Sequence, residues 1–281
     1  SGAIILVLFG LSGQLSDGFK NRLNKNELSI VEVIENYPSN NYVVEAFNKY
    51  SYKKKWTNDG KKKILIIGDS FAQDLFNALK EVDLIKKIDV TVKYVHNICG
   101  TLFIDKSDIV ALADKQNKRR CQDQLSLLED KNTLSLLQNA DHVLLASSWR
   151  SRDVDWLKKS LNNLSHLTNA EIIVFGTKTL VPVNLAHADM TANQRARFTI
   201  DLGNKLETQK RMRSIIFDFK FIDIQPILCA SPSTNYDLCK PFDNKGMPKS
   251  YDGGHLTKFG AIYYGLGIKN ELICMFFNEC S

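Results

Sequence analysis

Five short apolar runs, rich in β-branched residues, limit the folds open to this chain more than any other feature. Near-continuous hydrophobicity of this kind is typical of strands buried on both faces of a parallel sheet. Helix-spaced apolar residues lie between or after the runs, around 75–82, 154–164 and 259–266. Strands that alternate with helices predict an α/β fold, a doubly wound sandwich. The runs are KKILIIG (62–68), VTVKYV (90–95), HVLLASS (142–148), EIIVFGT (171–177) and FKFIDI (219–224).

Composition places the chain among ordinary globular proteins. Its 281 residues are enough for one large α/β domain, or one domain with a small appendage. The apolar fraction of 44% and the charged fraction of 24% exclude a disordered or collagenous chain. A net charge of +6 is weaker than the one-sided field of a dedicated nucleic-acid binder. The absence of P-loop, GxGxxG and HExxH motifs leaves nucleotide and zinc chemistry unsupported.

The six cysteines predict three disulfides and an oxidising compartment, since their number is even and they lack zinc-site spacing. Six cysteines allow 15 connectivities. Proximity in sequence favours Cys229–Cys239 and Cys274–Cys280, which leaves Cys99–Cys121. The alternative is six free thiols in a cytosolic enzyme.

The N-terminus carries an unbroken apolar run, AIILVLFGL, at residues 3–11. The run is too short for a complete membrane span, and it lacks the basic region of a signal peptide. We interpret it as the tail of a transmembrane helix. A short buried segment or edge strand is the alternative.

Two separated motifs contain the residues that fit nucleophilic catalysis. Ser70 follows the first apolar run in the tripeptide GDS, at a strand-to-helix turn where helix N–H groups favour an oxyanion. Asp252 and His255 lie in DGGH, just before the last helical segment. A serine nucleophile needs a neutral imidazole as base and a carboxylate that orients it. Taken singly, GDS also reads as a helix N-cap and DGGH as an ordinary turn.

Together the motifs resemble those of the SGNH hydrolase superfamily, over about residues 60–280. The resemblance implies a three-layer, flavodoxin-like α/β/α sandwich with a mostly parallel sheet and an N-terminal extension. It implies Ser70 as nucleophile, His255 as general base and then acid, and Asp252 as the residue that orients His255. It implies no metal.

The oxyanion hole shows both agreement with this superfamily and a departure from it. Ser70 and Gly100 are expected to supply its backbone donors. The usual GxND motif after the third strand is replaced by SSWR, which removes the expected Asn. Ser148 and Arg150 are candidate substitutes for that donor. Trp149 and Arg150 are candidate substrate contacts, although Trp149 can equally pack the sheet edge.

The apolar start, the segment before GDS, the SSWR sequence and the cysteine pairs narrow the resemblance to one subgroup. They are similar to the C-terminal periplasmic SGNH domain of bacterial acyltransferase-three family proteins, which O-acetylate surface glycans such as the lipopolysaccharide O-antigen. Residues 1–18 would then be the end of a transmembrane helix and a linker, 19–60 an extension packed on the core, and 61–281 the catalytic domain.

This subgroup implies an O-acetyltransferase that passes an acetyl group through a Ser70 acyl-enzyme to a polysaccharide hydroxyl. The domain itself would hold no cofactor. Acetyl-CoA would bind at an N-terminal membrane domain of the same polypeptide, and the SGNH domain would face the periplasm of an inner-membrane protein. A secreted SGNH carbohydrate esterase is the alternative enzyme, and an inert glycan-binding domain is a third hypothesis. We interpret Arg195 and Arg197 as part of a solvated helix face.

Overall fold

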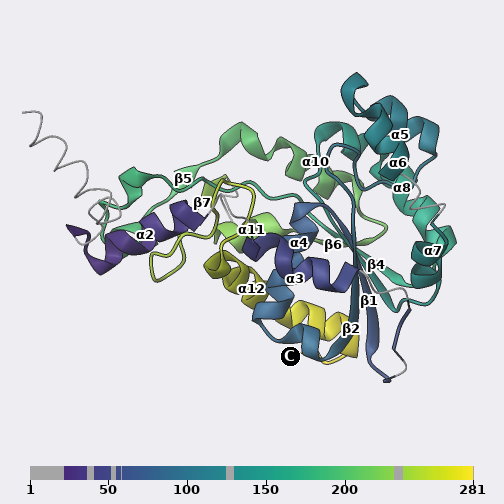
Figure 1. Ribbon diagram of the computed structural model, residues 1–281, viewed down its shortest axis with the longest axis horizontal. Helices are drawn as coiled ribbons and strands as arrows, with labels where there is room; N and C mark the ends of the chain where they lie inside the picture. The colour runs from purple at the N-terminus through teal and green to yellow at the C-terminus, as the bar shows by residue number, and fades with distance from the viewer. Residues whose placement is uncertain are drawn as a thin grey trace, which may run out of the picture.

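A computed structural model describes residues 22–36, 41–51, 55–57, 59–124, 130–230 and 237–280 of the chain (Figure 1). The predicted membrane-helix end and linker, residues 1–18, lie outside the described residues.

A five-stranded parallel sheet forms the centre of the fold, in the strand order β2-β1-β3-β4-β6. Each strand coincides with one of the five predicted runs, within a few residues at its ends. The chain passes from β1 to β2 on one side and later to β3 on the other. Ligands of such sheets bind at the carboxyl ends of the strands beside this switch point. The strands are β1 (Lys62–Gly68), β2 (Ile88–Tyr94), β3 (His142–Ala146), β4 (Glu171–Phe175) and β6 (Lys220–Ile222).

Helices cover both faces of the sheet, which gives the predicted three-layer α/β sandwich (Figure 1). Successive residues of β1 point to opposite faces, so Ile64 and Ile66 enter one core while Leu65 and Ile67 enter the other. One layer contains α3 (Asn41–Ser51), α4 (Ser70–Glu81), α11 (Ile224–Cys229) and α12 (Lys258–Phe277). The other contains α5 (Lys106–Leu112), α6 (Lys118–Gln124), α7 (Lys131–Gln138), α8 (Ser151–Leu167) and α10 (Glu207–Ile215).

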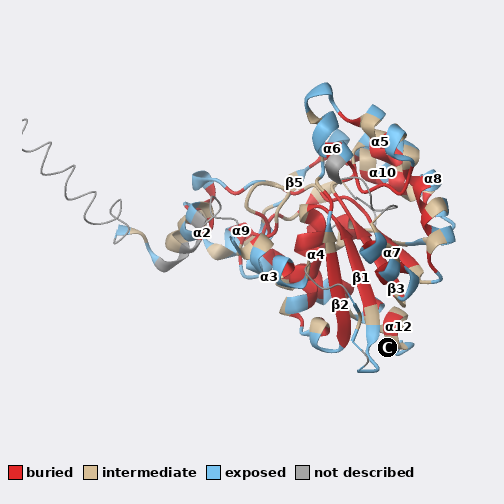
Figure 2. Cartoon of the chain, turned by 45° about the vertical axis from the view of Figure 1, so that its right-hand side comes forward, coloured by how far each residue is buried: buried red, intermediate tan, exposed pale blue. Residues whose placement is uncertain are grey.

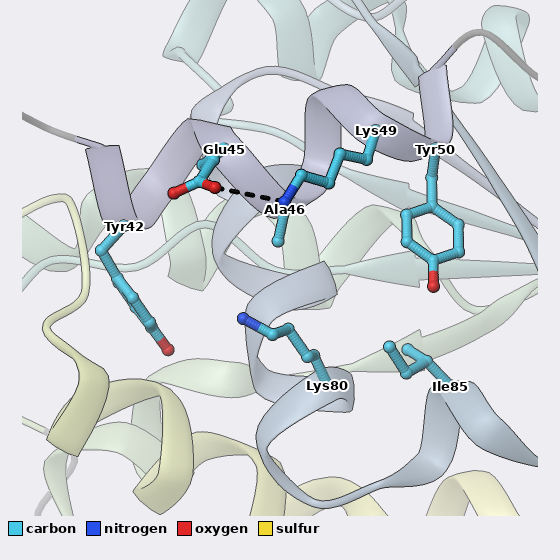
Figure 3. Close-up of a pocket in the computed structure, with 7 residues that line it drawn as sticks. All are labelled: Tyr42, Glu45, Ala46, Lys49, Tyr50, Lys80 and Ile85. Carbon is cyan, nitrogen blue, oxygen red and sulfur yellow. Dashed lines mark hydrogen bonds and ion pairs between the residues drawn. The ribbon is translucent and has the colours of Figure 1, made fainter.

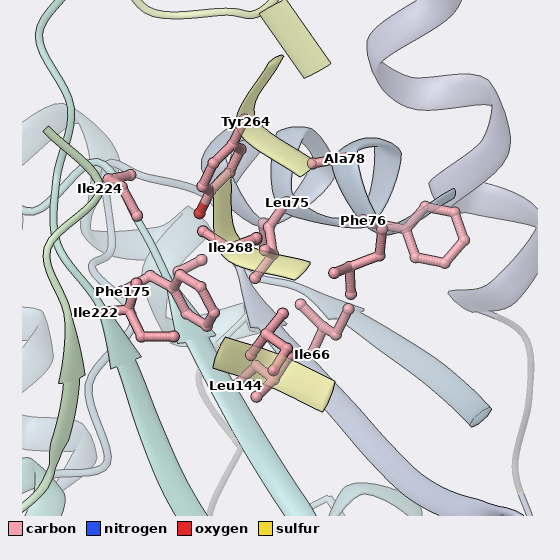
Figure 4. Packing of buried hydrophobic residues seen from close by; sticks show 14 of the residues in the cluster. Ile66, Leu75, Phe76, Ala78, Leu144, Phe175, Ile222, Ile224, Tyr264 and Ile268 are labelled. Carbon is pink, nitrogen blue, oxygen red and sulfur yellow. The ribbon is translucent and has the colours of Figure 1, made fainter. Parts of the chain in front are cut away.

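The buried strands and the inner faces of the helices form two continuous apolar cores (Figure 2). In the first core, Tyr264 and Ile268 of α12 meet Leu75 of α4 above the sheet (Figure 4). The two helices approach closely because Gly265 has no side chain: a Cβ there would lie 2.5 Å from the Ala78 carbonyl oxygen. Within the described part of the chain, α12 included, no helix combines the length and hydrophobicity that crossing a bilayer requires.

Helix α3, from the segment predicted as an extension, packs against α4 and β2 (Figure 1). Phe47 meets Phe76 edge to face at 6.0 Å, and the Asn77 side chain donates to the backbone carbonyls of Tyr42 and Val43. Between α3 and the end of α4 lies an open pocket of about 210 Å³ (Figure 3). It is lined by Tyr42, Glu45, Ala46, Lys49, Tyr50, Lys80 and Ile85. Lys80 lies ten residues along α4 from Ser70, or about 15 Å, so this pocket is separate from the predicted catalytic edge.

A smaller region, which contains α2, lies to one side of the sheet, at the left of Figure 1. Ile30 of α2 is buried with Val183, Ala188 and Phe242 in a separate apolar cluster. The elements of this region are α2 (Lys25–Asn36), α9 (Ala192–Arg197), and the antiparallel pair β5 (Ile200–Asp201) and β7 (Leu238–Cys239).

The six cysteines form the three disulfides that proximity favoured: Cys99–Cys121, Cys229–Cys239 and Cys274–Cys280. The alternative of six free thiols is therefore wrong for this structure. Cys99–Cys121 joins the loop after β2 to α6. The other two bridges close short local loops around α11 and at the end of α12.

Candidate active site

The predicted nucleophile lies at the sharp turn between β1 and α4. Ser70 is the first residue of α4, and the preceding Asp69 caps the helix by accepting the Phe71 N–H at 2.9 Å. Gly68 ends β1 where the neighbouring strand comes very close, since a Cβ at this position would lie 1.7 Å from the Ala146 carbonyl oxygen. Only glycine fits there, and this close approach brings Ser70 to the carboxyl edge of the sheet.

The two serines of the SSWR sequence have a specific task in this turn. Asp69 is completely buried, and its carboxylate accepts hydrogen bonds from the Ser147 hydroxyl at 2.8 Å and the Ser148 hydroxyl at 2.6 Å. The Ser148 N–H donates to it as well, at 2.9 Å. Because both Ser148 donors are engaged by Asp69, the structure offers no support for Ser148 as the substitute oxyanion donor.

Asp252 and His255 form a close acid–imidazole pair. The distance between His255 Nδ1 and Asp252 Oδ2 is 2.6 Å. The other carboxylate oxygen accepts the backbone N–H groups of Gly254 at 2.8 Å and His255 at 2.7 Å. An ionised carboxylate can only accept, so Nδ1 carries the shared proton and Nε2 is left as the basic nitrogen of the neutral ring. The His255 side chain is 26% exposed, so substrate or water can reach it.

The environment of this pair favours its ionic form. Burial opposes ionisation of Asp252, but the side-chain and backbone hydrogen bonds from His255 and the Gly254 amide hold the Asp252 pKa well below its ordinary value. The hydrogen bond that His255 donates to Asp252 raises the pKa of His255, against the opposing effect of burial. Asp252 thus remains charged at neutral pH and stabilises the protonated ring, which is the carboxylate's role in a catalytic triad.

A network of backbone and hydroxyl contacts fixes the turn that contains the pair. The Ser250 hydroxyl accepts the Gly253 N–H at 2.9 Å and donates to the His255 carbonyl at 2.8 Å. Gly253 has a φ of +89°, and a Cβ there would lie 2.9 Å from the Leu180 carbonyl oxygen. The Leu180 N–H in turn donates to the Gly253 carbonyl at 2.8 Å. The first glycine of DGGH is therefore required by both its conformation and its neighbour.

This turn packs on the first turns of the helix that begins at Ser70. The Leu256 N–H, next to His255, donates to the Asp74 side chain at 3.1 Å. A Cβ on Gly254 would lie 3.9 Å from the Phe71 ring. These contacts bring the DGGH turn to the start of α4 although the two segments are far apart in sequence. They support the prediction that Ser70, His255 and Asp252 act together.

Two further predicted site residues, Gly100 and Arg150, lie at or contact the loop after β2. Gly100 has a φ of +74° and is buried beside Asp153, and its N–H donates to the Asn97 carbonyl at 3.3 Å. A role for this N–H in an oxyanion hole stays a prediction. The Arg150 side chain is 36% exposed and donates to Asp153 and to the Ile98 carbonyl, so it lies at the same loop.

Trp149 does not present a binding surface. Only 3% of it is exposed, its ring lies in the second apolar core, and its indole N–H donates to the Phe175 carbonyl at 2.9 Å. The expectation that Trp149 contacts substrate is therefore not supported, and the alternative of packing against the sheet describes it. The physical reason is that the Phe175 carbonyl at the end of β4 lies within reach of the indole N–H, so the ring can be buried without losing a hydrogen bond.

The interpretation of Arg195 as part of a solvated face is wrong. The residue is 1% exposed, and its guanidinium donates to the carbonyls of Gly246 at 2.8 Å and Met190 at 2.7 Å. Sequence reasoning also missed Asp74 and Lys178, a buried ion pair beside the DGGH turn. The position of Asp74 four residues after Ser70, on the same helix face, was the available signal.

The sheet order, the serine at the β1–α4 turn and the Asp252–His255 pair are the features of an SGNH hydrolase-type α/β domain. Comparison with family models agrees: residues 39–266 match the model described as "SGNH domain (fused to AT3 domains)". This match covers most of the chain, so the chain belongs to that family of acyltransferase-associated SGNH domains. No curated protein matches the chain.

Proposed function

We propose that this domain transfers an acetyl group, through an acyl-enzyme on Ser70, to a hydroxyl of a cell-surface polysaccharide of the lipopolysaccharide O-antigen type. The observation that carries the proposal is the Asp252–His255 pair, which lies in a turn that packs against the helix beginning at Ser70. Membership of a family whose SGNH domains are fused to AT3 domains supports acyl transfer as the reaction class. The three disulfides support an oxidising compartment, in agreement with a periplasmic domain of an inner-membrane protein.

The chemistry follows from the roles of the three side chains. His255 Nε2 takes the Ser70 proton while the Ser70 oxygen attacks the acetyl carbonyl, and the donor's leaving group departs with that proton. The acceptor hydroxyl then attacks the acyl-enzyme, gives its proton to His255, and Ser70 is regenerated. Asp252 keeps its charge throughout and stabilises the imidazolium. Acetyl-CoA would be used by a membrane domain of the same polypeptide, so that the SGNH domain itself needs no cofactor.

The oxyanion that forms during acyl transfer needs hydrogen-bond donors near Ser70. The Ser70 N–H at the first turn of α4 is the first donor. Gly100, on the loop after β2, and the partly exposed Arg150, at the start of α8, are further candidates. Loss of one such donor costs about 2.7–4 kcal/mol in the barrier. Arg150→Ala is therefore expected to lower kcat by about 10²-fold or more if Arg150 replaces the missing Asn.

The direct test replaces Ser70 with Ala in the gene that encodes this chain and measures polysaccharide O-acetylation by NMR. Acetylation should disappear, while Ser107→Ala, at an exposed serine of α5, should leave it unchanged. Persistent acetylation in Ser70→Ala cells, with the protein present at normal levels, would overturn the proposal.

An esterase is the second candidate, because His255 is partly exposed and water could resolve the acyl-enzyme. The purified 281-residue chain, incubated with acetylated and unacetylated polysaccharide, separates the two functions. Fast release of acetate from the acetylated polymer would favour the esterase. Slow release, together with acetylation in cells that depends on Ser70, would favour the transferase.

A further inference from the structure

A fully buried ion pair lies beside the candidate active site. Lys178 Nζ and Asp74 Oδ2 are 3.0 Å apart, and each side chain is only 1% exposed. Burial raises the pKa of Asp74 and lowers the pKa of Lys178, and the charge of each partner opposes the effect of burial on the other. Removing two charges from water costs several kcal/mol per ion, so such a pair is weak evidence of a gain in stability. Its position points to another role.

The contacts of Asp74 join the two halves of the candidate site. Asp74 lies one helical turn after Ser70, on the same face of α4. Its second oxygen accepts the backbone N–H of Leu256, the residue after His255. One carboxylate thus connects the helix of the proposed nucleophile with the turn of the proposed base.

The contacts of Lys178 complete the connection from a third segment, which follows β4. The Lys178 ammonium lies 3.0 Å from the centre of the Phe71 ring, and Phe71 is the residue after Ser70. Two residues further on, Leu180 pairs with Gly253 of the DGGH turn through a 2.8 Å backbone hydrogen bond. The β4 segment, α4 and the DGGH turn therefore meet at the Asp74–Lys178 pair.

We propose that Asp74 and Lys178 are positioning residues. Their buried ion pair holds the turn that contains His255 against the start of α4, and their opposite charges offset each other's effect on the His255 imidazole. This role rests on the proposed function, in which His255 is the base for Ser70. Neither residue touches the reacting atoms in this scheme. Both act indirectly, by fixing the position of the His255 imidazole and by setting its affinity for a proton.

The electrostatic part of the proposal predicts opposite effects for the two charges. Besides Asp252, the charges of Asp74 from α4 and of Lys178 from the segment after β4 act on His255. The negative charge of Asp74 raises the pKa of His255, and the positive charge of Lys178 lowers it. Around the pair itself, Asp74 interacts electrostatically with Tyr42, Tyr251 and Tyr264, and Lys178 interacts with Asp69 and Asp252.

The test is a double-mutant cycle on the 281-residue chain, with the His255 imidazole titrated by NMR. Asp74→Asn keeps an acceptor for the Leu256 N–H but removes the negative charge, so the pKa of His255 should fall. Lys178→Met removes the positive charge, so the pKa should rise. The double variant should return toward the wild-type value. The acid limb of kcat/KM should move in the same directions, because His255 must be neutral to act as a base.

The positional part needs a second variant. Asp74→Ala also removes the acceptor of the Leu256 N–H, and it should lower kcat by about 10²-fold, as expected for a displacement near 1 Å. Asp74→Asn should recover most of that loss. Asp108→Asn and Lys159→Met provide the matched control, since Lys159 and Asp108 form a 3.0 Å ion pair that is partly exposed. These two variants should leave both kcat and the titration unchanged.

Equal or absent shifts in Asp74→Asn and Lys178→Met, in chains with a wild-type far-UV spectrum, would overturn the electrostatic role. Equal kcat in Asp74→Ala and Asp74→Asn would overturn the positional role. The NMR titration does not depend on Ser70. Opposite shifts of His255 together with persistent acetylation in Ser70→Ala cells would therefore reject the proposed function and leave the ion pair's effect on the imidazole established.

Discussion

Replacing Asp69 with Ala is expected to destabilise the fold severely, because one buried carboxylate satisfies four donors at the β1–α4 turn. These donors are the backbone N–H groups of Phe71 and Ser148 and the hydroxyls of Ser147 and Ser148. Loss of the helix cap costs about 1 kcal/mol. The stranded Ser148 amide adds roughly 1–3 kcal/mol, since a buried N–H without an acceptor loses its full solvation. The two hydroxyls can turn toward other acceptors, so we expect a total of about 2–4 kcal/mol.

Asp69→Asn gives a graded comparison. It keeps one acceptor oxygen for the two amides but places an NH2 group where the serine hydroxyls donate. The hydroxyls can rotate and accept instead, so the loss should be about 1–2 kcal/mol. Asp59→Ala is the control. This aspartate is exposed; it accepts the Lys61 N–H at 3.2 Å and forms an exposed ion pair with the Lys61 ammonium at 3.5 Å. Exposed contacts of this kind contribute little, so its removal should change stability by less than about 0.5 kcal/mol.

The assay is equilibrium unfolding of the 281-residue chain in urea with its disulfides intact. The free energies of unfolding of the variants are compared with a common m-value, the slope of that free energy against urea concentration. The order of destabilisation should be Asp69→Ala, then Asp69→Asn, then Asp59→Ala. If Asp69→Ala unfolded within about 1 kcal/mol of the wild-type chain, the four hydrogen bonds would not support the turn as argued. The role assigned to Ser147 and Ser148, as the donors that satisfy Asp69, would then be wrong as well.

Two further changes test the site and its supporting loop. Asp252→Asn should lower kcat by about 10³–10⁴-fold with little effect on folding. Because the hydrogen bond that His255 donates to Asp252 raises the His255 pKa, the acid limb of the pH–rate profile should also move to lower pH. An unmoved acid limb would argue against His255 as the base. Replacing Cys99 and Cys121 with Ala removes the disulfide that closes a loop of 22 residues. The free energy of unfolding, measured by urea titration, should fall by about 3 kcal/mol. An unchanged midpoint would show that other contacts hold the loop that contains Gly100.

The sheet and the DGGH pair could be predicted because their determinants are local in sequence. Each strand is recognisable in the sequence as a short apolar run, because a strand buried on both faces of a sheet needs apolar side chains at nearly every position. Asp252 and His255 are three residues apart, so one turn is enough to bring carboxylate and imidazole together, as their 2.6 Å contact confirms.

Burial of individual polar and aromatic groups could not be predicted in this way. Arg195 reads as a surface residue, yet it is enclosed because the loop around Gly246 folds over it and supplies a carbonyl oxygen. Trp149 has an equally ambiguous sequence context and packs inward because the Phe175 carbonyl is within reach of its N–H. In each case the deciding partner comes from a distant segment.

The amino-acid sequence by itself determined the layers of this protein, the place of Ser70 at a strand end and the pairing of Asp252 with His255. Only the tertiary structure decided what surrounds them: the serines that satisfy Asp69, and the meeting of Asp74 with Lys178. The physical reason is range. Periodicity and turn chemistry act over a few neighbouring residues, whereas the burial and compensation of a charge depend on which distant segments the packed core brings within a few ångströms.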